Sequence, residues 1–193
     1  MKILIILGSI RKNRFSEKPA KWIFEEAKKH EGLEVELVDL KDYPLPFFDE
    51  PISPSMIKEP YSNENVKILT KKVEEADGFV IISPEYNHGY SAVLKNMLDY
   101  IYKEWNNKAI GFVSYGAVGG ARVVEQLRQV AIELQMAPIR QAIHIPPQLF
   151  FDIMMGKNND PNPFDNLKQQ SDSFLNQLIW WTKTLKDARE QKD

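Results

Sequence analysis

Three short apolar runs limit the folds open to this chain more than any other feature of its sequence. They cover residues 3–7, 79–82 and 109–114, and Ile, Val, Leu and Phe dominate them. Strands that are apolar on both faces are typical of parallel sheets, because helices cover both faces of such a sheet. Each run leads into a polar loop and then into a segment with helical periodicity. The runs therefore predict an α/β protein built on a parallel sheet.

Two further strands are expected at residues 33–40 and 139–145, where apolar and polar side chains alternate. Alternation predicts one less buried face, so both strands belong at the edges of the sheet. The segments with helical periodicity are residues 16–29, 62–76, 89–105 and 120–136 and a terminal helix with Phe164, Leu167, Phe174, Leu178 and Leu185. The βα unit thus occurs five times, which predicts a doubly wound five-stranded sheet in the order 2-1-3-4-5.

Prolines interrupt this pattern in two regions. Five prolines within residues 41–61 exclude regular structure there, and a loop of this length is usually functional or packs against a partner. Residues 146–163 form a second proline-bearing loop. No linker, repeat or low-complexity tract divides the 193 residues, so we expect one domain over residues 1–193.

The composition excludes several classes of function. A formal net charge of -2, from 25 Lys and Arg against 27 Asp and Glu, creates no field that would attract nucleic acid or anionic lipid. The absence of cysteine excludes disulfides, thiolate metal sites and a cysteine nucleophile. No uncharged run approaches the roughly 18 residues of a membrane helix, and the first apolar run is too short for a signal peptide. We expect a soluble, cytoplasmic protein.

Metal and hydrolase chemistry find little support in the sequence. Three histidines are present at scattered positions, without a His-Glu-x-x-His motif, so no metal site is expected. Ser9, His88 and Asp152 supply the residue types of a hydrolase triad, but the chain has no Gly-x-Ser-x-Gly elbow. The sequence therefore favours a ligand site over a catalytic constellation of side chains.

In the predicted strand order the switch point lies between strands one and three, and the loops after them form the ligand crevice. The first loop offers Ser9, Arg11, Arg14 and Ser16 at the amino end of a helix. Backbone N–H groups, the helix dipole, hydroxyls and guanidinium groups together make a good phosphate site. The loop matches neither the dinucleotide fingerprint nor the nucleotide P-loop. An ordinary polar turn with solvated arginines would have the same composition.

The loops after the third and fourth strands complete the crevice. Residues 84–89 carry aromatic and polar side chains, and residues 114–120 are rich in glycine, so that backbone can approach a flat ligand closely. The nearby aromatic residues are Tyr86, His88, Tyr90 and Tyr115, which either stack on a ring or serve packing. Taken alone, these signals are compatible with both uses.

Motifs in all three loops resemble one known family. Gly8-Ser9-x-Arg11 follows the first strand, Pro84-Glu85-Tyr86-Asn87 follows the third, and Ser114-Tyr115-Gly116 with Gly119-Gly120 follows the fourth. Over residues 1–145 the chain is similar to the NADPH-dependent FMN reductase family, a flavodoxin-like group that includes quinone, azo-dye and chromate reductases. The resemblance implies a flavodoxin-like fold, FMN as the cofactor, and NADPH or NADH as the hydride donor.

The resemblance also implies which residues hold the cofactor. It implies a phosphate pocket in the first loop, contacts to the isoalloxazine and ribityl groups in the second, and a third wall in the last. The implied residues are Ser9, Arg11, Arg14, Phe15, Ser16, Pro84, Glu85, Tyr86, Asn87, Ser114, Tyr115 and Gly116. Some relatives carry serine in place of Arg14. Many read Gly-Gly-His-Gly-Gly where this chain reads Gly116-Ala117-Val118-Gly119-Gly120, which leaves the choice between NADPH and NADH open.

We therefore expect an FMN-dependent NAD(P)H oxidoreductase that reduces a flavin, quinone, azo compound or similar small acceptor. The flavin carries the chemistry, so no side chain of the protein is required as a catalytic acid or base. Two alternatives remain. One is an electron carrier of flavodoxin type, although such carriers are usually strongly acidic. The other is a flavin-binding regulatory module without turnover.

A homodimer is also expected. Apolar side chains outside the main stripe of the predicted helix 89–105, and within the proline-rich loop, need a cover; they are Val93, Tyr100, Tyr43, Leu45, Phe47 and Phe48. Exposed apolar patches on the order of a few hundred Å² or more usually mark an interface. The resemblance implies a two-fold dimer with the flavin near the subunit boundary. The alternative is that these residues fold back on their own sheet.

Overall fold

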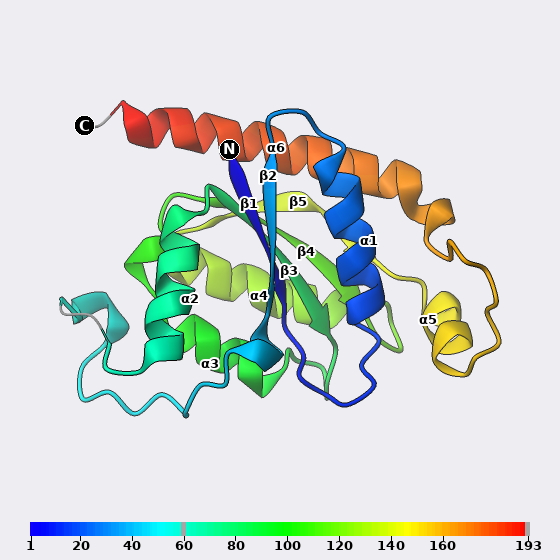
Figure 1. The fold of residues 1–193 in the computed structure, drawn as a ribbon, viewed down its shortest axis with the longest axis horizontal. Coiled ribbons are helices and arrows are strands. Elements are labelled where there is room, and N and C mark those ends of the chain that lie inside the picture. Colours follow the sequence, from blue (N-terminus) through cyan, green and yellow to red (C-terminus); the bar gives the residue numbers. More distant parts are fainter. Residues whose placement is uncertain (59–60, 192–193) are drawn as a thin grey trace.

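The computed structural model describes residues 1–58 and 61–191. Its centre is a five-stranded, all-parallel sheet in the order β2-β1-β3-β4-β5 (Figure 1). The strands are β1 (Lys2–Leu7), β2 (Glu34–Asp39), β3 (Gly78–Pro84), β4 (Ala109–Tyr115) and β5 (Ala137–His144). The predicted order is confirmed, and the two alternating strands lie at the edges as expected.

Helices cover both faces of the sheet, as apolar strands require. They are α1 (Glu17–Lys28), α2 (Glu64–Glu75), α3 (Ala92–Tyr100), α4 (Ala121–Glu133), α5 (Pro147–Met154) and α6 (Lys168–Glu190). One face is packed by α1 and α6, through side chains such as Ile23 and Phe174, and the other by α2, α3 and α4, through Leu69, Met97 and Leu127 (Figure 1). Among residues 1–58 and 61–191, no helix combines the length and the apolar character needed to cross a membrane.

Helix α3 is shorter than the predicted helix 89–105. Ser91 caps its first turn, because the Oγ atom accepts a hydrogen bond from a backbone N–H of that turn at 3.2 Å. The helix ends at Tyr100, where the next residue is extended and the hydroxyl of Tyr61 donates to the Tyr100 carbonyl. A separate 3₁₀ turn, Lys103–Trp105, then continues the apolar stripe. The apolar periodicity runs through helix α3 and this 3₁₀ turn, which is why the sequence predicts one long helix.

Two regions predicted as loops contain helical turns. The proline-rich region 41–61 is entered by one 3₁₀ turn, Leu40–Asp42, and contains another, Pro54–Met56. The region 146–163 contains α5, which begins at Pro147. Proline at the first helical position loses no hydrogen bond, because that N–H has no partner within the helix. The prediction of an irregular loop was therefore wrong for α5.

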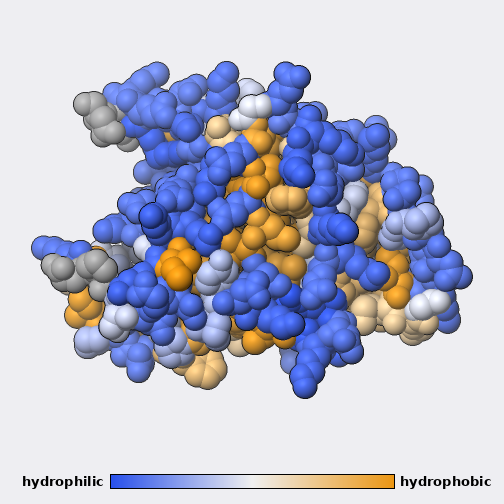
Figure 2. Space-filling model, viewed as in Figure 1, coloured by the Kyte–Doolittle hydropathy of each residue, from blue (hydrophilic) through white to orange (hydrophobic). Residues whose placement is uncertain are grey.

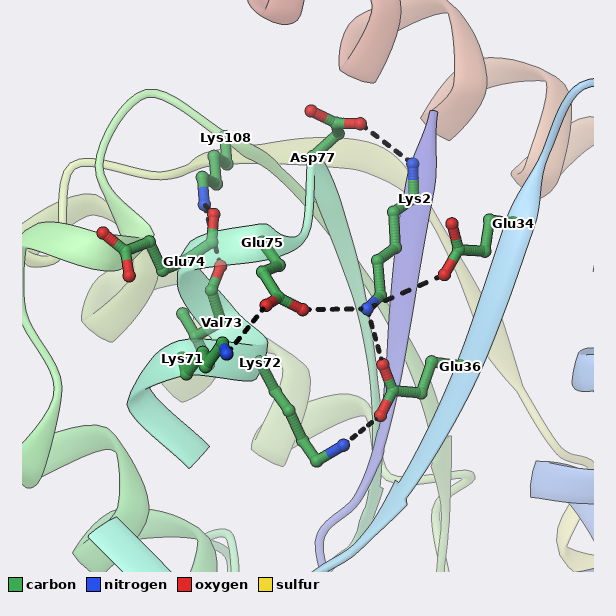
Figure 3. Close-up of polar contacts among 10 residues, drawn as sticks. All are labelled: Lys2, Glu34, Glu36, Lys71, Lys72, Val73, Glu74, Glu75, Asp77 and Lys108. Atoms are coloured by element: carbon green, nitrogen blue, oxygen red, sulfur yellow. Dashed lines mark hydrogen bonds and ion pairs between the residues drawn. The ribbon is translucent and has the colours of Figure 1, made fainter. Parts of the chain in front are cut away.

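Charged side chains join the elements at the amino end of the sheet, opposite the strand ends that carry the predicted loops (Figure 3). The ammonium group of Lys2 on β1 lies 2.8 Å from Glu36 on β2 and 3.3 Å from Glu75 on α2. Asp77 accepts a hydrogen bond from the backbone N–H of Lys2 and pairs with Lys186 on α6, both at 2.9 Å. These contacts tie β1, β2, α2 and α6 together.

The proline-rich loop folds back on its own chain. Asn96 of α3 holds it, because its Nδ2 donates to the Pro46 carbonyl at 2.7 Å and its Oδ1 accepts from the Phe48 N–H at 2.9 Å. Most apolar residues that suggested a dimer interface pack against the core of their own chain: Tyr100 is buried, and Tyr43, Leu45, Phe48 and Val93 are partly buried. Phe47 differs from them, since 81% of its surface is exposed. The alternative, that these residues fold back on their own chain, is therefore confirmed for the buried Tyr100, confirmed in part for the four partly buried residues, and wrong for Phe47.

Candidate functional site

A pocket of about 380 Å³ opens at the carboxyl ends of β1, β3 and β4, where the three predicted loops meet. Its lining comes from those loops and from α5: Arg11, Lys12, Asn13, Arg14, Phe15, Pro84, Glu85, Tyr86, Tyr115, Gly116, Ala117, Phe150 and Met154. Of the predicted site residues, Ser9, Ser16 and Ser114 are buried behind this lining, and Asn87 lies at an exposed loop tip. All the others line the pocket.

Hydrogen bonds and close packing fix the first loop against the second. Gly8 lies so near to β3 that a Cβ atom there would come within 3.1 Å of the Ile82 carbonyl oxygen, so a larger residue would force a shift. The Gly8 carbonyl accepts a hydrogen bond from the Ser91 hydroxyl at the start of α3. The hydroxyls of Ser9 and Tyr86 lie 3.0 Å apart and share a hydrogen bond. The two loops therefore hold a fixed distance from each other.

Arg14 is engaged by groups of its own chain. Its buried guanidinium group donates to both carboxylate oxygens of Asp39, to the Ser9 carbonyl and, from Nε, to Glu17 at 3.0 Å. Burial is the largest single effect and opposes the charge, but the hydrogen bonds and charges of Asp39 and Glu17 together outweigh it, so the pKa of Arg14 is raised. Arg14 therefore shapes the first loop, and the guanidinium group that faces the pocket without a carboxylate beside it is that of Arg11.

The amino end of α1 presents positive charge and polar groups to the pocket. Arg11 and Lys12 are exposed, and neither pairs with a carboxylate in the described part of the chain. The buried hydroxyl of Ser16 has no hydrogen-bond partner among the described residues. The helix dipole adds a partial positive charge at the same end. This combination fits an anionic group such as a phosphate.

The second loop is a tight turn braced from α4. Tyr86 and Gly89 exchange two backbone hydrogen bonds, of 2.8 and 2.9 Å, and Asn87 at the tip has a φ angle of 49°. Behind the turn, Arg122 Nε donates to the carboxylate of Glu85 at 2.6 Å, and that carboxylate side chain is 3% exposed. Sequence reasoning did not single out Arg122, because its partner lies 37 positions away and no local pattern relates the two.

The third loop needs glycine where it joins α4. Gly120 has a φ angle of 73°, and a Cβ atom there would lie 2.6 Å from the Cβ of Ser114. Ser114 Oγ donates to the Gly119 carbonyl at 2.8 Å, and His144 Nδ1 lies 3.0 Å from the same hydroxyl. Ser114 thus shapes the loop from behind, and Gly116 lines the pocket.

Aromatic rings form the apolar side of the pocket. The centroid of the Phe15 ring lies 4.8 Å from that of Tyr115 and 5.0 Å from that of Phe150. Burial raises the pKa of Tyr115 to about 12, so its phenol stays protonated at neutral pH and is not a base. Phe150 and Met154 belong to α5, and the prediction of a loop in that region is why neither was predicted as a site residue.

Ser9, His88 and Asp152, the residue types of a hydrolase triad, are not among the lining residues of the pocket. Ser9 and Asp152 bond to a tyrosine and a glutamine, and His88 lies 2.8 Å from Arg122. The residue types of a hydrolase triad are thus each engaged elsewhere. The arrangement suits a pocket that binds and orients a cofactor.

Proteins with similar sequences or structures include FMN-dependent reductases and a flavoenzyme. A NAD(P)H-dependent FMN reductase of Schizosaccharomyces pombe is 43% identical over 147 residues, which cover 75% of this chain and 74% of the relative. An FMN-dependent NADPH-azoreductase of Staphylococcus aureus is 28% identical over 185 residues, which cover 93% of this chain and 94% of that protein. The flavoenzyme FerB from Paracoccus denitrificans, an NAD(P)H:(acceptor) oxidoreductase, superposes with a TM-score of 0.67 at 22% identity, over 92% of this chain and 97% of that one.

The sequence profile of one family matches the part of the chain that builds the sheet and the three loops. The match spans residues 1–148 and therefore includes every residue that the motifs predicted for the site. On this match, the chain belongs to the NADPH-dependent FMN reductase family.

Proposed function

We propose that this chain is an FMN-dependent NAD(P)H oxidoreductase that passes hydride from a nicotinamide donor to a small-molecule acceptor. The observation that supports this most is the meeting of a cationic loop, a glycine-bearing wall and an aromatic wall in one pocket. A cationic end suits a phosphate, and flat walls suit a ring system. Family membership then points to FMN as the molecule that carries both.

The phosphate of FMN would lie at the amino end of α1. Arg11 and Lys12 would supply charge there, and the Ser16 hydroxyl and the first backbone N–H groups of the helix would supply hydrogen bonds. Arg14 has a different part in this proposal. Its bonds to Asp39 hold the loop in the shape that the phosphate needs.

The ring system and the ribityl chain would lie between the second and third loops. Residues 84–87 would contact the ring and the ribityl chain, and residues 114–116 would form a further wall of the site, with Phe15 packed against Tyr115. The hydrogen bond between Ser9 and Tyr86 fixes the tyrosine before any ligand arrives. Such preorganisation reduces the entropy lost on binding.

Bound FMN would supply the redox chemistry, accepting hydride from a nicotinamide and releasing it to an acceptor. The chain itself binds the phosphate, orients the ring and leaves one side of it accessible. No side chain has to move a proton in this scheme. Because one side of the ring stays accessible, donor and acceptor can use that side in turn.

A homodimer is part of the proposal. After the proline-rich loop folds back, apolar side chains on it remain exposed: Phe47, Ile52 and Met56, at 81%, 49% and 67%. Their position on one segment supports a self-complementary contact, which a two-fold pair of chains would bury.

Spectroscopy and steady-state kinetics of the purified protein test the proposed function. We expect copurifying FMN, and continuous oxidation of NADPH or NADH when menadione or ferricyanide is present. Assays with each donor in turn determine the donor preference. Flavin binding without continuous donor oxidation would support an electron carrier or a regulatory module instead. A protein that binds no flavin would contradict the proposal.

A further inference from the structure

The loop after β3 holds an unfavourable backbone conformation. Asn87 and His88 are consecutive and both have positive φ angles, of 49° and 71°. Left-handed backbone is costly for residues other than glycine, although asparagine and histidine adopt it more readily than most. Two backbone hydrogen bonds between Tyr86 and Gly89 close the turn. Residues in such a conformation keep it only where the surrounding structure holds them, so the contacts around this turn matter for its shape.

Helix α4 supplies such contacts through two side chains. Arg122 reaches both ends of the turn, because its Nε donates to Glu85 at 2.6 Å and its Nη1 donates to Nε2 of His88 at 2.8 Å. Gln126, one helical turn later, donates from Nε2 to the His88 carbonyl at 2.9 Å. Neither Arg122 nor Gln126 is among the residues that line the pocket. Both can therefore shape the site without touching its ligand.

The buried charge of Glu85 makes the loop depend on Arg122. The Glu85 side chain is 3% exposed, and its Oε2 atom is buried without a hydrogen-bond partner among the described residues. Gly116 of the third loop packs close to it, since a Cβ atom there would lie 3.1 Å from the Cβ of Glu85. A buried carboxylate is costly when no cation lies beside it. Without Arg122, this lining residue would turn toward water and the loop would change shape.

The charge of a ligand is met elsewhere, on the loop after β1. Figure 2 shows hydrophilic surface at the position that this loop occupies in Figure 1, in keeping with its exposed Arg11 and Lys12. Neither Arg122 nor Gln126 has a hydrogen bond to residues 8–16 in the described structure. The contacts from α4 therefore act on the loop that would meet the flavin ring, and not on the loop that would meet the phosphate.

We propose that Arg122, together with Gln126, is a positioning residue that holds the loop after β3 in the shape that receives the flavin ring system. The inference rests on the proposed function and adds two residues that act on the ring from outside the pocket. Their effect differs from that of Arg11, which would act on the phosphate. Flavins with and without a phosphate should therefore depend on Arg122 to the same degree.

Binding of two flavins to variants of α4 tests this role. The probes are FMN and riboflavin, and their dissociation constants for the flavin-free protein are measured by equilibrium dialysis. Arg122→Met removes both contacts of the guanidinium group and keeps much of the side-chain length. Arg122→Lys keeps the positive charge but not the planar fork. Gln129→Ala is the control, at an exposed residue of α4 that is absent from the pocket lining.

We expect Arg122→Met to weaken FMN and riboflavin binding equally, about ten- to hundredfold, the usual effect of losing a hydrogen bond to a charged group. Arg122→Lys should recover part of that loss, and Gln129→Ala should change either affinity less than about twofold. Unchanged affinities in Arg122→Met, or no recovery in Arg122→Lys, would overturn the inference. A loss for FMN alone would overturn it too, because Arg122 would then act on the phosphate.

Gln126→Ala decides the case in which Arg122→Met also lowers the melting temperature of the flavin-free protein. It deletes the other bond from α4 to the loop at an exposed residue, so that melting temperature should stay unchanged. Binding of both flavins should weaken about two- to tenfold. Unchanged binding in Gln126→Ala would then overturn the inference. In every case, flavin binding and NADPH oxidation by the wild-type protein would leave the proposed function standing.

Discussion

Lys108 is a buried cation whose role is structural. Its Nζ donates to the carbonyls of Val73 and Glu74 at the end of α2, both at 2.8 Å (Figure 3). It also lies 5.7 Å from the Phe79 ring centroid. Burial lowers the pKa of Lys108 from 10.5 to about 8. The folded chain thus releases this proton at a lower pH than the unfolded chain does.

A pH-dependent stability follows from Lys108. Between about pH 8 and 10.5 the unfolded chain holds a proton that the folded chain has lost, so this residue makes stability rise with pH in that window. The rise is at most about 3 kcal/mol, and partial solvent screening reduces it. Urea unfolding of the wild type and of Lys108→Met at several pH values measures the difference. The gap in unfolding free energy between the two proteins should grow in favour of the wild type; a constant gap would mean that Lys108 has an ordinary pKa.

The hydroxyl of Tyr86 should matter for the cofactor more than for the fold. Tyr86→Phe removes the hydrogen bond to Ser9, worth about 0.5–1.5 kcal/mol, and should weaken FMN binding roughly two- to tenfold. The melting temperature of the apoprotein should change little, because the ring stays in place. Tyr90→Phe is the matched control on the same loop. If both variants bind FMN like the wild type, the Ser9–Tyr86 contact does not prepare the site.

At the scale of elements, local patterns predicted the sheet well. Continuous apolar runs predicted the inner strands, and alternating runs predicted the edge strands. Both predictions succeeded because the number of buried faces of a strand determines the pattern of apolar residues along it. Proline was less reliable. The fifth strand was predicted at residues 139–145, yet β5 begins at Ala137 and includes Pro138, since an edge strand tolerates proline. Proline at the start of α5 also led to the prediction of a loop where the structure has a helix.

The candidate site was predictable only where short motifs carry it. Tyr86 and Gly116 belong to such motifs and do line the pocket. The capture of Arg14 by Asp39 depends on a partner 25 positions away, which no periodicity reveals. Phe150 and Met154 reach the pocket only because α5 packs beside it. The partner of Arg14 and the place of Phe150 and Met154 in the pocket depend on contacts between distant segments, and no local pattern in the sequence reveals such contacts.

The docking of α6 on β4 gives a test at the same scale. Gly111 lies directly beneath Phe174, and a Cβ atom there would come within 2.5 Å of the Phe174 ring. Gly111→Ala should therefore destabilise the protein by about 1–3 kcal/mol in urea unfolding. Adding Phe174→Leu should recover part of the loss caused by the alanine, so the two changes should not be additive. Strict additivity would show that the helix adjusts without strain.

In the whole molecule, the stabilising ion pairs and the candidate binding pocket lie at opposite ends of the sheet. Ion pairs close the amino end of the sheet, and the pocket opens at the carboxyl end. The proline-rich loop begins after the carboxyl end of β2, contributes no lining residue to the pocket, and carries the exposed Phe47.

The proposed homodimer is a property at this largest scale. Sedimentation of the FMN-loaded protein at micromolar concentration should give the mass of a dimer. Phe47→Asp should weaken self-association at least tenfold, because it places a charge in an apolar contact. Ile132→Asp, at a residue of α4 that is 65% exposed, is the control and should leave the dimer intact. A single species of monomer mass for the wild type would contradict the dimer.

The loop after β1 is the part of the molecule on which the proposed function depends most, because it would hold the phosphate of FMN. The most direct test compares the dissociation constants of FMN and riboflavin for the wild type, Arg11→Ala and the control Arg140→Ala, an exposed arginine on β5. Charge-assisted hydrogen bonds contribute about 1.5–3 kcal/mol, so Arg11→Ala should weaken FMN binding roughly ten- to hundredfold. It should leave riboflavin binding unchanged, because riboflavin has no phosphate, and Arg140→Ala should affect neither ligand. Unchanged FMN affinity in Arg11→Ala, or an equal loss for FMN and riboflavin, would contradict the account.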